Sequence, residues 1–222
     1  MGNTEDKPTK PSVRRRATAI KPFRAKHCLV VLENPNEIKN IGTVIRNVNA
    51  FGATSLYVVD PHHKLPEDWE EARKRKSLRK TSVSAVQWTY IKRFDTTVAC
   101  ISHLKKRGYK SLATSPHVQG KPCHFLHEAD FTQYARVALW FGNEGRGLST
   151  EAIEHAEACI AIPMFGIVES LNLGTSTGIV LCEATRQRRA YQSQFKRAGR
   201  HKKRKEKLPT EMPIEDSFGR ER

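Results

Sequence analysis

The segment CIAIPMFGIVESLNLGTSTGIVLCEATRQRRAY, residues 159–191, joins a short apolar run, a mixed loop and a long periodic stretch. Pro163 breaks the apolar run, and from Leu173 onward apolar residues recur at helical spacing. This pattern predicts a strand, a tight loop and a long helix. The loop mixes apolar residues with Ser170 and Asn172. Because solvated loops rarely have this composition, we expect it to be buried against another part of the protein.

Two interpretations of Ser170 and Asn172 fit this pattern. A buried Asn172 amide must find partners in the protein or a ligand, because an unpaired buried polar group costs about 1–3 kcal/mol. That interpretation indicates a binding site. Alternatively, both residues serve only as the N-cap of the following helix, where Ser and Asn are preferred.

Positive charge is concentrated at the two ends of the chain. Residues 1–26 contain eight Lys or Arg and two acidic residues, and residues 186–222 contain thirteen and five, within a total net charge of +16. Such basic segments typically bind polyanions, because each neutralised phosphate releases counterions. Nucleic acid is therefore the expected partner. No apolar stretch approaches the roughly 20 residues that span a bilayer, so no membrane partner is expected.

The five cysteines are scattered and include no C-x-x-C pair. We therefore expect neither a disulfide framework nor a metal site. The cysteines are expected to be reduced core residues of a cytoplasmic protein.

The central part of the chain alternates strand-like and helix-like segments. Strands are expected over residues 28–32, 55–60, 86–91, 110–114, 137–142 and about 159–162, and helices over 41–53, 95–108, 150–158 and from 173 onward. Such alternation predicts one α/β domain with a parallel sheet flanked by helices. We place this domain at residues 27–192, between a basic, flexible N-terminal arm (1–26) and a basic C-terminal tail without fixed structure (193–222). The charged stretch 62–80 is expected to lie outside the core.

Three loops follow predicted strands, at the edge where parallel sheets collect ligands. The first leads from Asn40 to Arg46, the second is GNEGRG (142–147), and the third is 163–172. The second loop brings a carboxylate, Glu144, close to its glycines, but the third glycine of a dinucleotide-binding fingerprint is absent. Considered alone, Asn40 is as consistent with a helix N-cap as with a site residue. Arg46 is as consistent with a side chain directed to solvent as with a site residue.

Three motifs resemble those of a known family. NIGTVIRNVNAFGA (40–53), LWFGNEGRGLS (139–149) and IPMFGIVESLNLGTSTGIVLCEATRQR (162–188) are similar, in order and spacing, to the motifs of the SpoU (TrmH-type) branch of the SPOUT RNA methyltransferases. The third is most similar to tRNA guanosine-18 2′-O-methyltransferases. The resemblance covers about residues 27–192. It implies a parallel sheet with a C-terminal deep trefoil knot, S-adenosylmethionine as cofactor, structured RNA as substrate, with tRNA ahead of rRNA, and a homodimer.

The resemblance also implies residue roles. Arg46 would act at the ribose 2′-hydroxyl, either in removing its proton or electrostatically, while other polar residues position it, the cofactor and the ribose. These positioning residues are Asn40, Glu144, Ser170 and Asn172. Cofactor contacts are expected at Thr114, Gly142, Ile162, Met164 and Leu171. RNA contacts are expected at Arg186 and Arg188 and, in the basic tail, at Arg197, Arg200, Lys202 and Lys203.

One departure and two rival functions remain. Leu173-Gly174 stands where the family usually has Val-Ser, which predicts a looser start to the last helix. A non-catalytic RNA-binding protein with the same fold is the main rival. A nucleotide-dependent oxidoreductase is the second rival, and the missing fingerprint argues against it.

Overall fold

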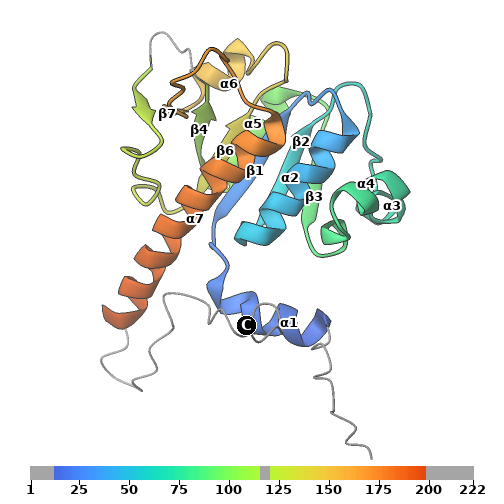
Figure 1. Cartoon of the computed structure of the whole chain (residues 1–222), viewed down its shortest axis with the longest axis horizontal. Coiled ribbons are helices and arrows are strands. Elements are labelled where there is room, and N and C mark those ends of the chain that lie inside the picture. The colour runs from blue at the N-terminus through green and yellow to red at the C-terminus, as the bar shows by residue number, and fades with distance from the viewer. Residues whose placement is uncertain (1–12, 116–120, 199–222) are drawn as a thin grey trace, which may run out of the picture. The chain divides into compact units, whose positions relative to one another are not determined.

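The computed structural model describes residues 13–115 and 121–198 of the 222-residue chain. The chain divides into a compact unit, Ala25–Arg188, and a second unit formed by the residues before and after it. The sheet and its main covering helices belong to the first unit (Figure 1).

A seven-stranded sheet forms the centre of this unit, in the order β3-β2-β1-β6-β4-β7-β5, and every pairing is parallel. The prediction of an α/β fold with a parallel sheet is confirmed. Parallel strands are joined by crossovers that cover both faces, which explains why every residue of β1, β2, β6 and β7 is buried. The strands are β1 (Cys28–Glu33), β2 (Ser55–Val59), β3 (Tyr90–Phe94), β4 (Lys110–Thr114), β5 (Cys123–Phe125), β6 (Val137–Phe141) and β7 (Ala158–Ala161).

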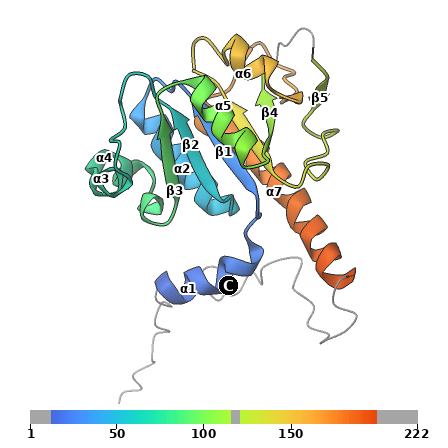
Figure 2. The ribbon, with the colours of Figure 1, turned by 180° about the vertical axis from the view of Figure 1, so that it is seen from behind.

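Helices cover the two faces of the sheet separately. Val30 and Leu32 of β1 belong to one core cluster, together with α2 (Ile38–Phe51) and the first turns of α7 (Leu173–Ala198). Leu29 and Val31 belong to the other, with α5 (Thr97–Lys106) and α6 (Thr150–Glu154). Figure 1 shows α2 and α7 in front of the sheet, and Figure 2 shows α5 in front of its opposite face. This alternation follows from the two-residue period of a strand.

Local sequence signals place the end of α2 and the start of α6 where expected, but α6 ends at Glu154 and not at residue 158. Gly52 adopts φ 74° and ends α2, as predicted, because glycine enters the left-handed region without steric cost. The Ser149 hydroxyl accepts a hydrogen bond from the Ala152 N–H and caps α6, also as predicted. The start of α2 is earlier than expected, at Ile38 with Glu37 as N-cap, so Asn40 lies inside the helix and is not its cap.

Two predictions about the segment before β3 are wrong. Residues 62–80 do reach the core: Leu65, Ala72 and Leu78 are buried, and two short helices, α3 (Trp69–Lys74) and α4 (Lys76–Thr81), form there. The strand expected over 86–91 begins only at Tyr90, after the 3-10 turn η2 (Ala85–Gln87). A short apolar run does not distinguish these conformations by its periodicity.

The ends of the described chain also differ from expectation. The basic segment before His27 contains α1 (Val13–Ile20) and a 3-10 turn, η1 (Lys21–Phe23), and Ala25 is fully buried. Helix α7 continues to Ala198, past the expected boundary of the tail. Residues 1–12 and 199–222 lie outside the described part.

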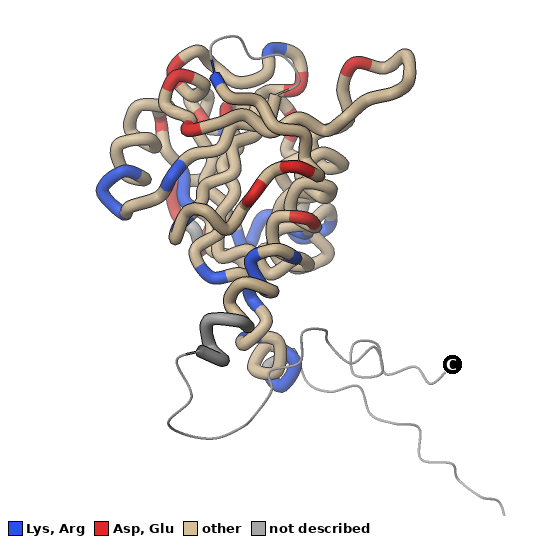
Figure 3. Tube along the Cα trace, turned by 90° about the vertical axis from the view of Figure 1, so that its left-hand side faces the viewer, with Lys and Arg blue, Asp and Glu red and all other residues tan. Residues whose placement is uncertain are grey.

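All five cysteines are free, but the expectation that they are core residues holds for only three. Cys28, Cys100 and Cys159 are buried, whereas Cys123 and Cys182 are exposed. Along the trace of the chain, Lys and Arg lie among Asp and Glu (Figure 3). Among the residues that the structure describes, no helix is long and apolar enough to cross a membrane.

Candidate active site

A hydrogen-bonded polar cluster joins three segments at the carboxyl end of the sheet. The Asn40 amide of α2 donates to Glu144 Oε1 over 2.6 Å. The Asn36 backbone N–H donates to Glu144 Oε2 over 2.8 Å, and the Asn172 amide donates to Asn40 Oδ1 over 3.2 Å. The structure therefore brings together three predicted site residues, Asn40, Glu144 and Asn172, from distant parts of the chain.

The electrostatics of the cluster favour an ionised Glu144. Partial burial acts to raise the pKa of this carboxyl, but the hydrogen bonds from the Asn40 amide and the Asn36 N–H outweigh it, so the pKa lies below its ordinary value. A carboxylate that accepts on both oxygens is a weak proton acceptor. Glu144 is therefore suited to positioning Asn40 rather than to general base catalysis.

The loop after β6 is held in a compact turn. Asn143 Oδ1 accepts from the backbone N–H groups of Gly145 and Arg146, over 2.9 and 3.1 Å. A Cβ added to Gly142 would lie 2.1 Å from the carbonyl carbon of Gly147, so only glycine fits at position 142. Gly142 thus lets the loop fold back and present Glu144 to α2.

Asn172 shows that the two interpretations of its segment are compatible. Its Oδ1 accepts from the Gly174 N–H over 2.8 Å, which makes Asn172 the N-cap of α7, while its amide reaches Asn40. Asn172 is exposed, contrary to the expectation of burial.

The start of α7 is closely packed, contrary to the looser start that Leu173-Gly174 predicted. A Cβ on Gly174 would lie 2.5 Å from Thr43 Cγ2, so glycine lets α7 approach α2 closely. The Asn47 amide of α2 donates to the Gly174 carbonyl over 2.6 Å.

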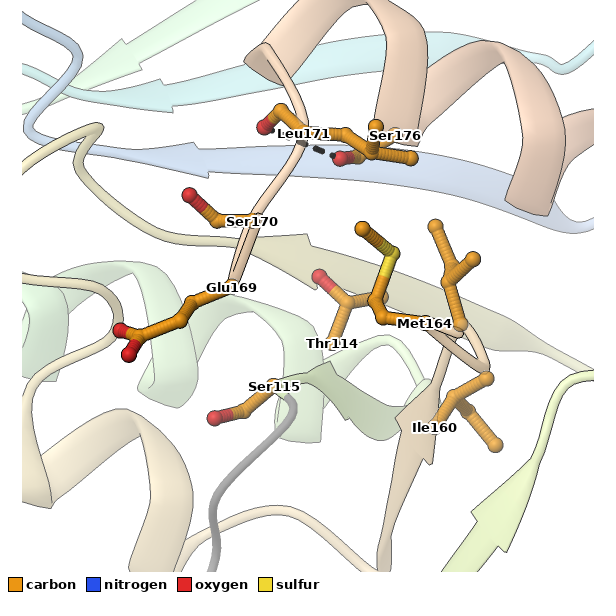
Figure 4. A pocket seen from close by; sticks show the side chains of 9 residues that line it. Thr114, Ser115, Ile160, Met164, Glu169, Ser170, Leu171 and Ser176 are labelled. Atoms are coloured by element: carbon orange, nitrogen blue, oxygen red, sulfur yellow. Dashed lines mark hydrogen bonds between the residues drawn. The ribbon is translucent and has the colours of Figure 1, made fainter. Parts of the chain in front are cut away.

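A pocket opens beside this cluster, between the ends of β4 and β7 and the segment before α7 (Figure 4). Its cavity volume is about 90 Å³. Four of the five expected cofactor contacts line it, as does Ser170; Gly142 does not. The lining residues are Thr114, Ser115, Ile160, Ile162, Met164, Glu169, Ser170, Leu171 and Ser176.

Sequence reasoning missed four lining residues: Ser115, Ile160, Glu169 and Ser176. For Ile160 and Ser115 the missed signal was strand pairing, since Thr114 lies opposite Ile160 in the parallel pair β4–β7 and Ser115 follows Thr114.

The lining is compatible with a nucleoside cofactor that carries positive charge. Ile160, Ile162 and Met164 supply apolar surface, and the Ser170 and Ser176 hydroxyls supply hydrogen-bonding groups. The one carboxylate of the lining belongs to Glu169. Small-molecule sites usually have volumes of about 300–1,000 Å³, so the enclosed part of this pocket is smaller than a typical ligand site.

The loop between Pro163 and Asn172 is exposed, contrary to prediction. Phe165 is 97% exposed, Ile167 is fully exposed, and Val168 is 61% exposed. Composition favoured burial of these side chains, but composition does not specify whether the same chain provides the cover.

Arg46 is exposed and is not among the residues that line the pocket. Ile41, Val44, Ile45 and Val48 form the buried face of α2, and a spacing of 100° per residue places Arg46 on the opposite, exposed side. Within the described residues it makes no hydrogen bond or ion pair, and it does not line the pocket.

Similarity to a known protein family bears on which of the functional classes raised by the sequence applies. A family model described as the SpoU rRNA Methylase family matches residues 27–182. The chain belongs to this family.

Relatives of this SpoU-family chain carry consistent names. A tRNA (guanosine(18)-2′-O)-methyltransferase of Thermus thermophilus is 30% identical over 175 residues, which cover 79% of this chain and 82% of the relative. Its counterpart in Aquifex aeolicus is 32% identical, with 74% of this chain and 72% of the relative covered. A 23S rRNA (guanosine-2′-O-)-methyltransferase, RlmB, of Vibrio vulnificus is 28% identical, with 82% and 70% covered.

Solved structures give the same result. The A. aeolicus TrmH/SpoU tRNA modifying enzyme superposes with a TM-score of 0.65 at 28% identity, covering 81% of this chain and 85% of that one. An AdoMet-bound rRNA methyltransferase from Sinorhizobium meliloti gives 0.60 at 29% identity, covering 72% and 56%. The predicted class, an RNA 2′-O-methyltransferase that uses S-adenosylmethionine, is confirmed.

One RNA contact expected of this SpoU-family chain needs correction. Arg188 is buried, and its guanidinium donates to the carbonyls of Phe131, Tyr134 and Ala135 over 2.8, 3.0 and 2.7 Å. It therefore anchors the segment before β6 and is not available to RNA. The spacing could not reveal this, because the partners lie more than fifty residues away.

Of the other expected RNA contacts, the structure describes the side chain of Arg186 only. Arg186 is exposed and pairs with Glu183 through two hydrogen bonds of 2.8 and 2.6 Å. Arg197 lies in α7, but its side chain is outside the described part, as are Arg200, Lys202 and Lys203.

Proposed function

We propose that this SpoU-family chain transfers the methyl group of S-adenosylmethionine to a ribose 2′-hydroxyl of tRNA, with guanosine 18 as the target. The observation that carries the proposal is the continuity of pocket and polar cluster. Ser170 and Leu171 line the pocket, and the next residue, Asn172, bonds to Asn40. Relatives named for tRNA guanosine 18 support this substrate over rRNA.

The pocket residues would hold the cofactor, which supplies an electrophilic methyl group when bound. Ile160, Ile162 and Met164 would contact its apolar surface, and the negative Glu169 carboxylate would attract its positive charge. The hydrogen bonds of Asn40 to Glu144 and Asn172 fix the position of α2 beside the pocket.

Arg46 is proposed to orient the ribose hydroxyl and its neighbouring phosphate. A guanidinium donates up to five N–H bonds and accepts none, so it stabilises developing negative charge rather than taking a proton. Ser170, at the pocket, is proposed to position the ribose.

The proposal includes the trefoil knot that the resemblance implies, and a homodimer. The exposed side chains of Phe165 and Ile167 support an interface, because two large apolar side chains in water are unfavourable. In a twofold dimer Arg46 would serve the partner's pocket, which agrees with its absence from the lining of its own pocket. The cytoplasm, where thiols stay reduced, is the proposed compartment.

Substrate choice is tested by labelled methyl transfer from S-adenosylmethionine into unmodified tRNA and, separately, into 23S rRNA fragments. We expect label in tRNA, and loss of that label when guanosine 18 is replaced. Label only in rRNA fragments would contradict the tRNA assignment. RNA binding without transfer to either substrate would favour the non-catalytic rival. A thermal unfolding midpoint raised by NAD but not by S-adenosylmethionine would favour the oxidoreductase.

A further inference from the structure

Helix α4 carries three basic side chains on one face. Lys76, Arg79 and Lys80 are spaced i, i+3 and i+4, so they fall within about 100° around the helix axis. All three are exposed, and Leu78, on the opposite side, is fully buried. The buried residue fixes the orientation of the helix, so the basic face is held toward solvent.

This basic face lacks neutralising partners. Within the described residues, Lys76, Arg79 and Lys80 make no ion pair, and α4 contains no acidic residue. The neighbouring helix α3 carries two acids: Glu70 is paired with Arg73, and Glu71 forms no ion pair with the three basic side chains. Like charges at i, i+4 destabilise a helix by about 0.2–0.5 kcal/mol, so the arrangement is unfavourable unless an anion binds.

The position of α4 links this face to Arg46. Thr81, at the end of α4, packs against Gly42 of α2 so closely that a Cβ on Gly42 would lie 1.7 Å from Thr81 Oγ1. Arg46 follows Gly42 by one helical turn, about 6 Å along α2, and its side chain tilts back toward that crossing. Figure 1 shows α4 at the side of α2. Arg46 and the basic face both point away from the core.

We infer that Lys76, Arg79 and Lys80 form a phosphate-binding surface that holds the backbone of the substrate RNA and guides it toward Arg46. The inference rests on the proposed function for the identity of the RNA. Lysine and arginine on an exposed face contact phosphates without reading bases, so the surface contributes affinity and orientation rather than sequence choice.

The test is a triple variant, Lys76→Gln/Arg79→Gln/Lys80→Gln. Glutamine retains helix propensity, and removing the repulsion should leave the thermal midpoint unchanged or raise it. The matched control, Lys105→Gln/Lys106→Gln/Arg107→Gln, removes the same charge from exposed residues at the end of α5, on the opposite face of the sheet. A second variant, Lys76→Arg/Lys80→Arg, keeps the charge and should bind RNA as the wild type does.

Binding of unmodified tRNA is measured at several salt concentrations. For the α4 variant we expect the dissociation constant at 100 mM salt to rise about tenfold or more, and the log–log salt slope to become shallower by about 2–3. The control should change the constant by less than about twofold. An α4 variant that matches the control in both quantities overturns the inference.

Methyl transfer measured over a range of tRNA concentrations separates this inference from the proposed function. We expect the α4 variant to need about tenfold more tRNA to reach half of its maximal rate, because its residues hold the RNA but lie outside the cluster and the pocket. If the wild type transfers methyl and the α4 variant binds tRNA normally, the α4 inference fails alone. If the wild type transfers no methyl, the proposed function fails, and the tRNA-binding comparison still decides the role of α4.

Discussion

At the residue scale, the cluster around Asn40 depends on amide and carboxylate groups that satisfy one another. Asn40 both donates to Glu144 and accepts from Asn172, so it links α2 to two other loops. Removing its side chain leaves Glu144 Oε1 and the Asn172 amide without these partners, at a cost of about 1–3 kcal/mol for each group that stays buried. Because both of these groups are partly solvated, the loss of folding free energy is smaller, but the site segments still lose their alignment.

We predict that Asn40→Ala lowers the rate of methyl transfer by about tenfold to a hundredfold, because misplaced site segments lose the alignment that transfer needs. The matched control is Asn49→Ala, on the same helix, whose amide reaches Thr89 instead. Initial rates at saturating tRNA and cofactor measure both variants. Equal rates for the two would contradict the positioning role of Asn40.

Arg186 and Arg188, two residues apart, give opposite predictions. Arg188→Ala removes a buried donor to several carbonyls and should lower the free energy of unfolding by about 2–4 kcal/mol. Arg186→Ala breaks an exposed ion pair and should change it by less than about 1 kcal/mol. Urea unfolding measures both. A larger loss for Arg186 would refute the structural role of Arg188.

At the element scale, the sequence predicted what depends on local periodicity. The helix that contains Val44 and Val48, and its end at Gly52, followed from spacing and from glycine chemistry. The strand expected at 86–91 begins only at Tyr90, because an apolar run of that length fits a turn as well as a strand.

The site residues likewise fall into those that motifs identified and those that only the tertiary structure decides. Asn40, Glu144 and Asn172 were identified from motifs, and the structure joins them through bonds that span more than a hundred residues. Arg188 could not be distinguished from Arg186 by sequence, because only tertiary packing decides which arginine is buried.

The close packing of Gly174 of α7 against Thr43 of α2 gives a prediction at this scale. Gly174→Ala places a methyl group against Thr43 Cγ2 and should lower the free energy of unfolding by about 1–3 kcal/mol. Gly166→Ala is the control, because no atom lies within 4 Å of its added Cβ. Adding Thr43→Ser to Gly174→Ala removes the clashing methyl and should recover part of the loss. No recovery in thermal unfolding would contradict the packing explanation.

At the scale of the whole molecule, the arrangement of Arg46 and the pocket bears on assembly. The proposed dimer would cover the exposed loop at Phe165 and Ile167 and bring the Arg46 of one protomer to the pocket of the other. The exposure of this loop and the position of Arg46 outside its own pocket would then both result from dimer formation, because a twofold axis repeats each contact in both protomers.

We predict complementation between two inactive variants. Arg46→Ala keeps its pocket, and Ser176→Trp fills its pocket but keeps Arg46. If Arg46 acts on the partner's pocket, co-refolded mixtures contain heterodimers with one complete site and recover about a quarter of wild-type activity. Arg46→Ala alone should still be stabilised by S-adenosylmethionine. A mixture with no activity, despite heterodimers seen by mass measurement, would contradict the shared site.

The most direct test of the central claim is the position of the transferred methyl group. Wild-type protein, labelled S-adenosylmethionine and unmodified tRNA are incubated, and the labelled RNA is digested with alkali, which cleaves only next to a free 2′-hydroxyl. We expect the label in a single dinucleotide that resists alkaline cleavage. Label released as an ordinary mononucleotide would place the methyl group on a base and contradict ribose 2′-O-methylation.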